Sequence, residues 1–167
     1  APSFASGEEL ERFHQERQIL AQLQHPNIAT LLDGGTTEDN RPYLVMEFIE
    51  GSTIINYCQQ QKLSINKRLA LFIEVCNAVS FAHRHLIIHR DIKPGNICQT
   101  GDGGFVLLDL GIAQVLSLDP LTQTGVVSPK TNPYAAPEQF MARGQTSIDA
   151  RTDLFAAGIV LFEAATG

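Results

Sequence analysis

The sequence predicts an α+β fold in which short strands come first along the chain and helices follow. Short apolar runs separated by turn residues occupy positions 28–48, which is typical of strands. A long apolar pattern with helical spacing begins after position 64 and a second apolar stretch closes the chain. This order suggests two lobes, which we expect to divide into residues 1–48 and residues 49–167.

A helix is expected before the strands. Ser6 followed by Glu9 is typical of a capping box, and the pair His25-Pro26 is expected to end the helix. Glu16 falls on the apolar stripe of this helix, where a carboxylate is costly unless it is paired. The stripe consists of Leu10, Phe13, Leu20 and Leu23.

Two antiparallel strands are expected next, over residues 28–32 and 43–48, because turn-forming residues separate these runs. The turn residues are Asp33-Gly34-Gly35 and the stretch 39–42. The runs 97–98 and 105–108 flank a glycine-rich turn and predict a small hairpin.

The second part of the chain is expected to be mainly helical. Ser64 can cap a long amphipathic helix that ends near His85, and residues 155–165 are apolar enough for a buried helix. Residues 112–133 show no sustained period and predict a long functional loop. The apolar face of the long helix comprises Leu69, Phe72, Val75, Cys76, Val79 and Ala82.

Composition narrows the class of protein. The 167 residues are 44% apolar and 18% charged, which is ordinary for a globular domain. A net charge of −6 disfavours nucleic acid and anionic membranes as partners. Cys58, Cys76 and Cys98 lack paired spacing, so we expect reduced, mostly buried thiols and a cytoplasmic location, with any membrane anchor lying outside this chain.

Four residues supply the groups that phosphoryl transfer needs. Asp91 offers a carboxylate for an acceptor hydroxyl and Lys93 a cation for the γ-phosphate, while Asn96 and Asp109 offer oxygen ligands for Mg²⁺. Each has a simpler explanation when taken alone. Asp91 and Lys93 could form a solvated ion pair, Asn96 could be a turn residue, and Asp109 could cap a strand.

The combination of motifs resembles a eukaryotic-type protein kinase. The run 89–96 has the pattern H-R-D-x-K-x-x-N of the catalytic loop. Residues 109–111 have the pattern D-L-G, which resembles the metal loop, and residues 136–138 are the Ala-Pro-Glu that ends the activation segment. The chain looks most like bacterial serine/threonine kinases, and the resemblance extends from Glu16 to Asp153. It implies a partial two-lobed kinase fold, part of the N-lobe sheet with one helix and the first part of the C-lobe.

The resemblance implies roles for the catalytic residues. Asp91 becomes the proton acceptor, Lys93 contacts phosphate, and Asn96 and Asp109 hold Mg²⁺. At Leu110, where most of the family has Phe, we expect an apolar plug of smaller area. The family's regulatory stack would include Leu20, Leu31, His89 and Leu110, although core packing explains the leucines equally well.

The resemblance also implies roles around the activation segment. Arg90 would pair with a phosphate on Thr122 or Thr124, unless these are unmodified loop residues. Thr131 would bridge Asp91 and Lys93, which favours serine/threonine specificity. Glu138 would pair with an arginine further along the protein.

Asp153 would anchor the catalytic loop by accepting hydrogen bonds from the backbone around His89 and Arg90. His89 is expected to be structural. A zinc site formed with His83 and His85 is the disfavoured alternative, because the cluster lacks convergent cysteine or carboxylate spacing.

By the same resemblance, residues 43–51 form a strand and hinge for adenine. Met46 would guard the back of the pocket, the backbone of Glu47 and Ile49 would meet the base, and Cys98 would line the floor. A buried strand followed by a turn would explain these residues without a ligand. Glu16 would hold the lysine that grips the ATP phosphates, but every lysine lies after Glu16 and the chain has no glycine-rich phosphate loop.

We therefore expect a fragment of a serine/threonine kinase that uses ATP and Mg²⁺ to phosphorylate proteins. The isolated fragment is expected to be nearly inactive, and the parent could dimerise for activation-loop autophosphorylation. A pseudokinase-like interaction module is the alternative, and a small-molecule phosphotransferase is disfavoured by Thr131 and Ala136-Pro137-Glu138.

Overall fold

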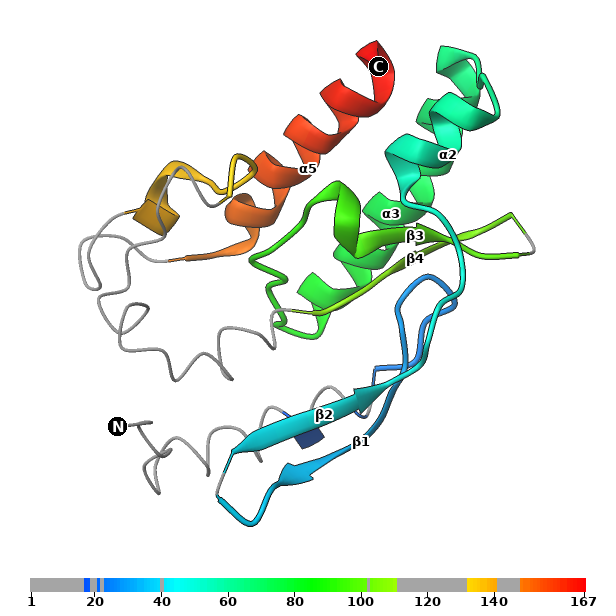
Figure 1. Ribbon diagram of the computed structural model, residues 1–167. Helices are drawn as coiled ribbons and strands as arrows, with labels where there is room; N and C mark the ends of the chain where they lie inside the picture. Colours follow the sequence, from blue (N-terminus) through cyan, green and yellow to red (C-terminus); the bar gives the residue numbers. More distant parts are fainter. Residues whose placement is uncertain are drawn as a thin grey trace.

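The computed structural model describes residues 17–18, 21, 23–39, 41–101, 103–110, 132–140 and 148–167. Figure 1 shows a strand pair, β1 and β2, lying apart from a helical part that contains α2, α3 and α5. The β3–β4 hairpin runs across the helical part on the side that faces the strand pair. The arrangement agrees with an α+β fold in which strands precede helices.

The first sheet is the antiparallel pair β1 (Leu31–Thr36) and β2 (Pro42–Met46). The prediction of two antiparallel strands is confirmed, but the expected turn at Asp33-Gly34-Gly35 is wrong, since these residues lie inside β1. A Cβ on Gly34 would come within 2.7 Å of Leu44 Cδ2, so glycine permits close packing there rather than a turn.

Helix α3 (Ile65–Arg84) is the longest element, with Ser64 at its N-cap position and His85 at its C-cap, as the sequence predicts. The Ser64 side chain makes no capping hydrogen bond. Leu69 and Cys76 are exposed, contrary to the prediction, because a helix turns about 100° per residue and carries both beyond the edge of the buried stripe. That stripe consists of Phe72, Val75, Ala78, Val79 and Ala82.

Helix α5 (Ala150–Thr166) lies beside α3 and begins five residues before the expected start at Phe155. Its N-cap is Asp149, whose side chain accepts a hydrogen bond from the Arg151 amide at 2.9 Å. The expectation of a buried helix is confirmed for one face only, the alanine-rich face that packs inward. Leu154 and Phe162 on the outer face are 60% and 70% exposed.

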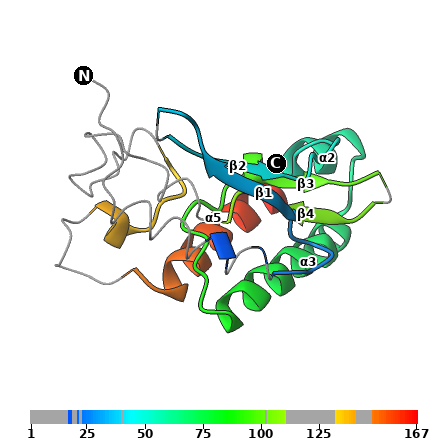
Figure 2. The same cartoon turned by 90° about the horizontal axis from the view of Figure 1, so that it is seen from below.

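The hairpin of β3 (Ile97–Gln99) and β4 (Phe105–Leu107) confirms the prediction from the glycine-rich turn. The Leu107 amide donates to the Asn27 carbonyl at 2.9 Å, and the Ala29 amide donates to the Leu107 carbonyl at 3.0 Å. The residues just before β1 therefore bond directly to β4. This junction attaches the strand pair to the helical part (Figure 2).

Three short helices complete the described elements: α2 (Ile54–Gln60) and the 3-10 helices η1 (Pro94–Asn96) and η2 (Pro137–Phe140). α2 was not predicted as a separate helix. The core joins α2, α3, α5 and the hairpin, with Ile54, Ile97 and Val160 completely buried. Among the helices described, none combines the length and hydropathy required of a membrane span.

Candidate active site

Asp153, in the first turn of α5, fixes the backbone that precedes Asp91. Its carboxylate is 1% exposed and accepts hydrogen bonds from the amides of His89 at 2.8 Å and Arg90 at 2.7 Å. These are the donors that the sequence predicts. Arg90 has a φ of +65°, a conformation that L-residues adopt at a cost and that these bonds compensate.

His83 supplies a third contact to Asp153, which the sequence does not predict. Its Nε2 lies 2.8 Å from Asp153 Oδ2, and its side chain is 17% exposed. The helical spacing of α3 gives a weak signal for this contact, because His83 follows directly after the buried residue Ala82. His83 thereby connects the long helix to the anchor of the catalytic loop.

His89 is held inside the loop by both ring nitrogens. Nδ1 accepts from the Asp91 amide at 3.3 Å, so Nε2 carries the proton and donates to the Leu108 carbonyl at 2.9 Å. Burial lowers the pKa of His89, although the charge of Asp153 acts in the opposite direction. A neutral, hydrogen-bonded imidazole agrees with the structural interpretation of this residue.

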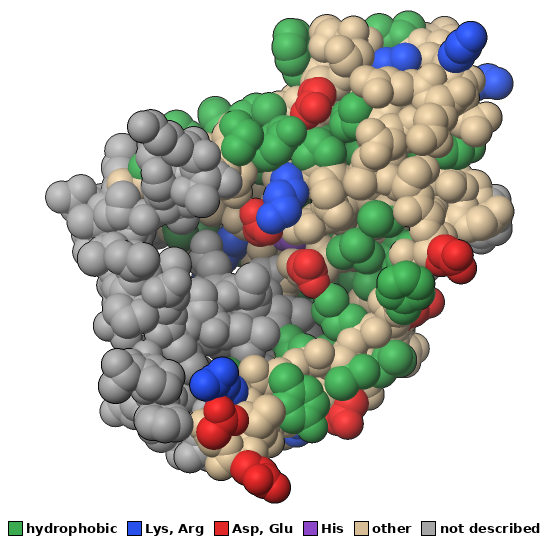
Figure 3. Space-filling view, in the orientation of Figure 1, with side chains coloured by type: hydrophobic (Ala, Val, Ile, Leu, Met, Phe, Trp, Pro, Cys, Tyr) green, Lys and Arg blue, Asp and Glu red, His purple; other side chains and the backbone are tan. Residues whose placement is uncertain are grey.

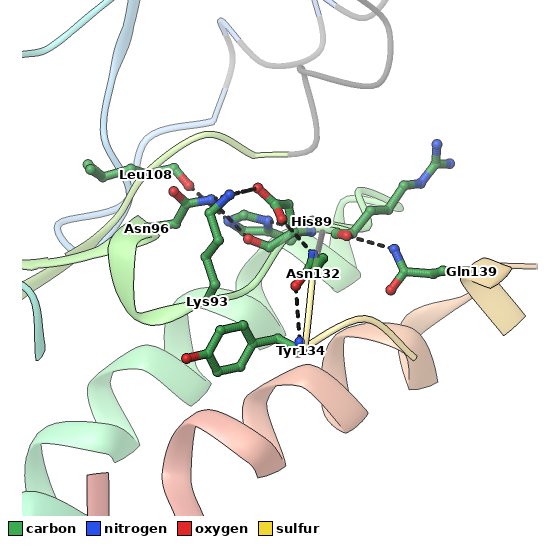
Figure 4. A network of polar contacts seen from close by, with 9 residues as sticks. His89, Lys93, Asn96, Leu108, Asn132, Tyr134 and Gln139 are labelled. Carbon is green, nitrogen blue, oxygen red and sulfur yellow. Dashed lines mark hydrogen bonds and ion pairs between the residues drawn. The ribbon is translucent and has the colours of Figure 1, made fainter. Parts of the chain in front are cut away.

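The carboxylate of Asp91 receives donors at both oxygens (Figure 4). Lys93 Nζ lies 2.6 Å from Oδ2, and Asn96 Nδ2 donates to the same oxygen at 3.1 Å. Asn132 Nδ2 donates to Oδ1 at 3.0 Å. Asp91 and Lys93 do form the ion pair that was the simpler explanation of these residues. Their side chains are 29% and 41% exposed, so the pair is partly accessible to solvent. The amide donors distinguish Asp91 from an ordinary surface carboxylate.

Asn96 and Asp109 present oxygen atoms on adjoining segments. Asn96 is 6% exposed, and its Nδ2 also donates to the Asp91 carbonyl at 2.9 Å, which leaves Oδ1 without a hydrogen bond from the described residues. The Leu108 amide donates to the Asn96 carbonyl at 2.8 Å, and the next residue, Asp109, is exposed with a φ of +53°. An amide oxygen and a carboxylate oxygen are hard ligands that suit Mg²⁺.

Leu110 is 7% exposed and belongs to the hydrophobic core. It therefore fills an apolar position directly after Asp109, as expected. Leu31 packs against the same core, whereas Leu20 lies outside the described residues.

The segment 132–140 contacts the catalytic loop through the side-chain amides of Asn132 and Gln139, which are not among the predicted site residues. Gln139 is 3% exposed, and its Nε2 donates to the Arg90 carbonyl at 2.8 Å while its Oε1 accepts from the Ala136 amide at 2.9 Å. Asn132 accepts from the Tyr134 amide at 3.0 Å. The only signal in the sequence was the presence of amide side chains on either side of Ala136-Pro137-Glu138.

Glu138 has a partner within the chain. Its Oε1 accepts a hydrogen bond from Thr152 Oγ1 at 2.6 Å, so the segment is also joined to the start of α5. The expected arginine partner, further along the protein, stays a prediction. Among the described residues, Arg90 Nε is buried without a hydrogen-bond partner. Glu16, Thr122, Thr124 and Thr131 lie outside the described residues.

The stretch that follows β2 keeps backbone groups available for a ligand. The Glu47 amide donates to the Thr30 carbonyl at 2.9 Å, but the Glu47 carbonyl and the Ile49 amide make no hydrogen bond with described residues. Met46 ends β2 and packs against the core. Cys98 is 9% exposed, and burial raises the pKa of its thiol.

Gly51 brings this stretch against β3. A Cβ at this position would lie 1.7 Å from the Gln99 carbonyl oxygen, so no other residue fits without movement of the backbone. The Gln99 amide also donates to the Ser52 carbonyl at 2.8 Å. In the space-filling view, the surface is indented between the strand pair and the helical part, and charged side chains lie at the indentation (Figure 3).

Comparisons with a protein-family model and with curated proteins both point to protein kinases. The family described as "Protein kinase domain" matches residues 3–167. The "Probable serine/threonine-protein kinase PknB" of Lactococcus lactis is 40% identical over 157 residues, which cover 93% of this chain and 24% of that protein. The "Serine/threonine-protein kinase PknB" of Mycolicibacterium smegmatis is 38% identical over 162 residues, covering 93% and 25%. The chain therefore spans about a quarter of the length of these curated relatives.

Proposed function

The chain belongs to the protein kinase family, and on this premise we propose that the protein containing it transfers the γ-phosphate of ATP to serine or threonine hydroxyls of proteins. The observation that carries the proposal is the environment of Asp91. Its carboxylate is oriented by Lys93, Asn96 and Asn132 and still has 29% of its side-chain surface open to an incoming hydroxyl.

Asp91 is the group that orients the acceptor hydroxyl and accepts its proton. As the proton moves to the carboxylate, the hydroxyl oxygen bonds to the γ-phosphorus and the bond from that phosphorus to the bridging oxygen breaks, so ADP leaves with the electron pair. Lys93 has three N–H donors, so one can remain on Asp91 Oδ2 while another contacts the transferred phosphoryl group.

Asn96 Oδ1 and the Asp109 carboxylate are the candidate ligands for Mg²⁺, which would neutralise phosphate charge in the reaction. The Glu47 carbonyl and the Ile49 amide would take the polar edge of adenine, with Met46 at the back of the site and Cys98 on its floor. Glu16 would orient the lysine that binds the ATP phosphates. This assignment requires a lysine other than the four in this chain, which all follow Glu16.

Serine/threonine specificity is supported by Lys93, two residues after Asp91, and by the names of the bacterial relatives. Thr131 would bridge the two side chains when a protein substrate is bound. Arg90, whose Nε is buried without a partner among the described residues, is a candidate to bind a phosphate on Thr122 or Thr124. Autophosphorylation between two copies in the cytoplasm would supply that phosphate.

The test uses the full-length protein with Mg-ATP and a generic protein substrate. Asp91→Asn is expected to lower kcat by about 10²- to 10⁴-fold, because the proton acceptor is lost. Asp39→Asn is the matched control, since Asp39 lies on the β1–β2 turn with 49% of its side chain exposed. Absence of Mg²⁺-dependent phosphoserine or phosphothreonine formation by the unmodified protein would contradict the proposal and favour a pseudokinase-like interaction module.

A further inference from the structure

We propose that Asn132 is a positioning residue for phosphoryl transfer, and that its side-chain amide holds the Asp91 carboxylate in the orientation that receives the substrate proton. The inference rests on the proposed function. It starts from one contact, between Asn132 Nδ2 and Asp91 Oδ1, at 3.0 Å. The two residues are 41 positions apart, so the contact depends on how the chain folds and not on local spacing.

The donors on Asp91 are divided unequally between its two oxygens. Lys93 and Asn96 both bond Oδ2, whereas Asn132 is the only described residue with a hydrogen bond to the Oδ1 atom. Donors on both oxygens restrict rotation of the carboxylate about its Cβ–Cγ bond more tightly than donors on Oδ2 alone. Since a carboxylate oxygen accepts about two hydrogen bonds, Oδ1 retains a lone pair for the hydroxyl of a substrate.

Asn132 is itself held in place at the oxygen end of its amide group. Its Oδ1 accepts from the Tyr134 amide at 3.0 Å, which directs the NH₂ end toward the catalytic loop (Figure 4). Tyr134 in turn donates from its hydroxyl to Glu163 Oε2 on α5 at 2.8 Å. The donor to Asp91 is therefore supported from the helical part of the protein. Such support is what a positioning group requires, because a misplacement of about 1 Å can cost about 10²-fold in rate.

A purely structural role for Asn132 is the alternative, because asparagine side chains often stabilise turns through their oxygen. The two roles use different ends of the same amide. Asn132→Asp keeps an oxygen for the Tyr134 amide and replaces only the donor. Asn132→Ala removes both ends but adds no charge beside Asp91. The only change that the two variants share in the contact with Asp91 is the loss of the Nδ2 donor.

The experiment measures kcat, KM and the melting temperature of the full-length protein and its variants with Mg-ATP and a protein substrate. Both Asn132→Asp and Asn132→Ala are expected to lower kcat by about 10-fold or more, with KM for ATP within about twofold. Asn27→Asp is the matched control. It removes a comparable amide donor, from Asn27 Nδ2 to the Phe105 carbonyl at 2.8 Å, outside the site and is expected to leave kcat unchanged.

The possible results distinguish a failure of the proposed function from a failure of the role assigned to Asn132. An unmodified protein without kinase activity overturns the proposed function and the inference with it. An active protein whose kcat is unchanged in both variants overturns the inference alone, as does a fall in melting temperature without a fall in kcat. A fall in kcat for Asn132→Asp only would be due to the added charge and would also overturn it. Should one variant fail to fold, Asn132→Leu replaces it, since leucine has a similar volume and carries no hydrogen-bond donor.

Discussion

The catalytic loop, residues 89–96, and the β1–β2 strand pair satisfy their backbone groups by different means. In the strand pair, the antiparallel ladder runs from the pair Leu31 and Met46 to the pair Thr36 and Pro42, and most side chains are half-buried or exposed. In the catalytic loop, backbone groups bond to the side chains of Asp153 and Gln139, which are 1% and 3% exposed.

The two regions should therefore differ in which substitutions destabilise them. A strand ladder uses main-chain atoms that every residue except proline carries, so it tolerates many side chains. An irregular loop held by buried polar side chains depends on those particular residues, because removing one acceptor leaves several buried donors unsatisfied. Substitutions in the two regions therefore test this comparison. The expected loss in the free energy of unfolding is largest for residues that hold the catalytic loop and smallest in the strand pair.

The largest effect is expected for Asp153→Ala. Removing this carboxylate leaves the His89 and Arg90 amides and His83 without their acceptor, and the expected loss in the free energy of unfolding is about 4 kcal/mol. Urea unfolding measures it. Asp149→Ala, at the N-cap of the same helix, is the matched control, because this half-exposed carboxylate contacts only Arg151 among the described residues and the loss of a cap costs about 1 kcal/mol. Equal losses for the two variants would contradict the assigned role of Asp153.

Gly51→Ala tests the boundary between the two regions. The added Cβ would lie 1.7 Å from the Gln99 carbonyl oxygen, which belongs to β3, and the backbone must move. We expect a loss of about 3 kcal/mol in the free energy of unfolding, measured by urea denaturation. Gly158→Ala in α5 is the control, since its Cβ would meet nothing within 4 Å, and a gain of about 1 kcal/mol is expected. If Gly51→Ala left the free energy of unfolding unchanged, the contact between Gly51 and β3 would not be closely packed.

The pH dependence of stability tests the buried imidazole of the catalytic loop. Burial lowers the pKa of His89 below its unfolded value of 6.5, so below that pH the unfolded chain binds more protons and the free energy of unfolding falls. The expected slope approaches about 1.4 kcal/mol per pH unit for this group. Urea unfolding between pH 7.5 and 5.5 measures it, and His89→Gln should flatten the curve.

The control for that measurement is His25→Gln. Burial and Arg84 also lower the pKa of His25, which is more exposed than His89, so its removal is expected to change the slope less. If the free energy of unfolding of His89→Gln showed the same slope with pH as the unmodified protein, another group would be responsible for the pH dependence.

The smallest effect is expected in the strand pair. Val45 is 42% exposed on β2, and Val45→Thr should change the free energy of unfolding by less than about 0.5 kcal/mol. Leu44→Thr, on the neighbouring position that packs against the core, is expected to cost more. Thermal melting of both variants measures the difference. A large loss for Val45→Thr would indicate that the exposed face of β2 is covered in the full-length protein.

Features that depend on local spacing could be predicted from the sequence. The period of residues 65–84 identified α3 and its ends, the glycine-rich turn identified the β3–β4 hairpin, and the contiguous run 89–96 identified the catalytic loop. These predictions are correct because the residues that define each feature are neighbours along the chain. Interior burial was predicted less well, as the exposed Cys76 and Phe162 show, because it depends on which face another helix covers.

The distant side chains that hold the catalytic loop could not be predicted from the sequence and are seen only in the folded chain. Asn132 meets Asp91 across 41 positions, Gln139 meets Arg90 across 49, and His83 meets Asp153 across 70. The same types of residue at these positions could equally face solvent, and no periodicity distinguishes the two cases. A hydrogen bond requires its donor and acceptor atoms to lie within about 3 Å of each other, and the path of the whole chain sets that distance.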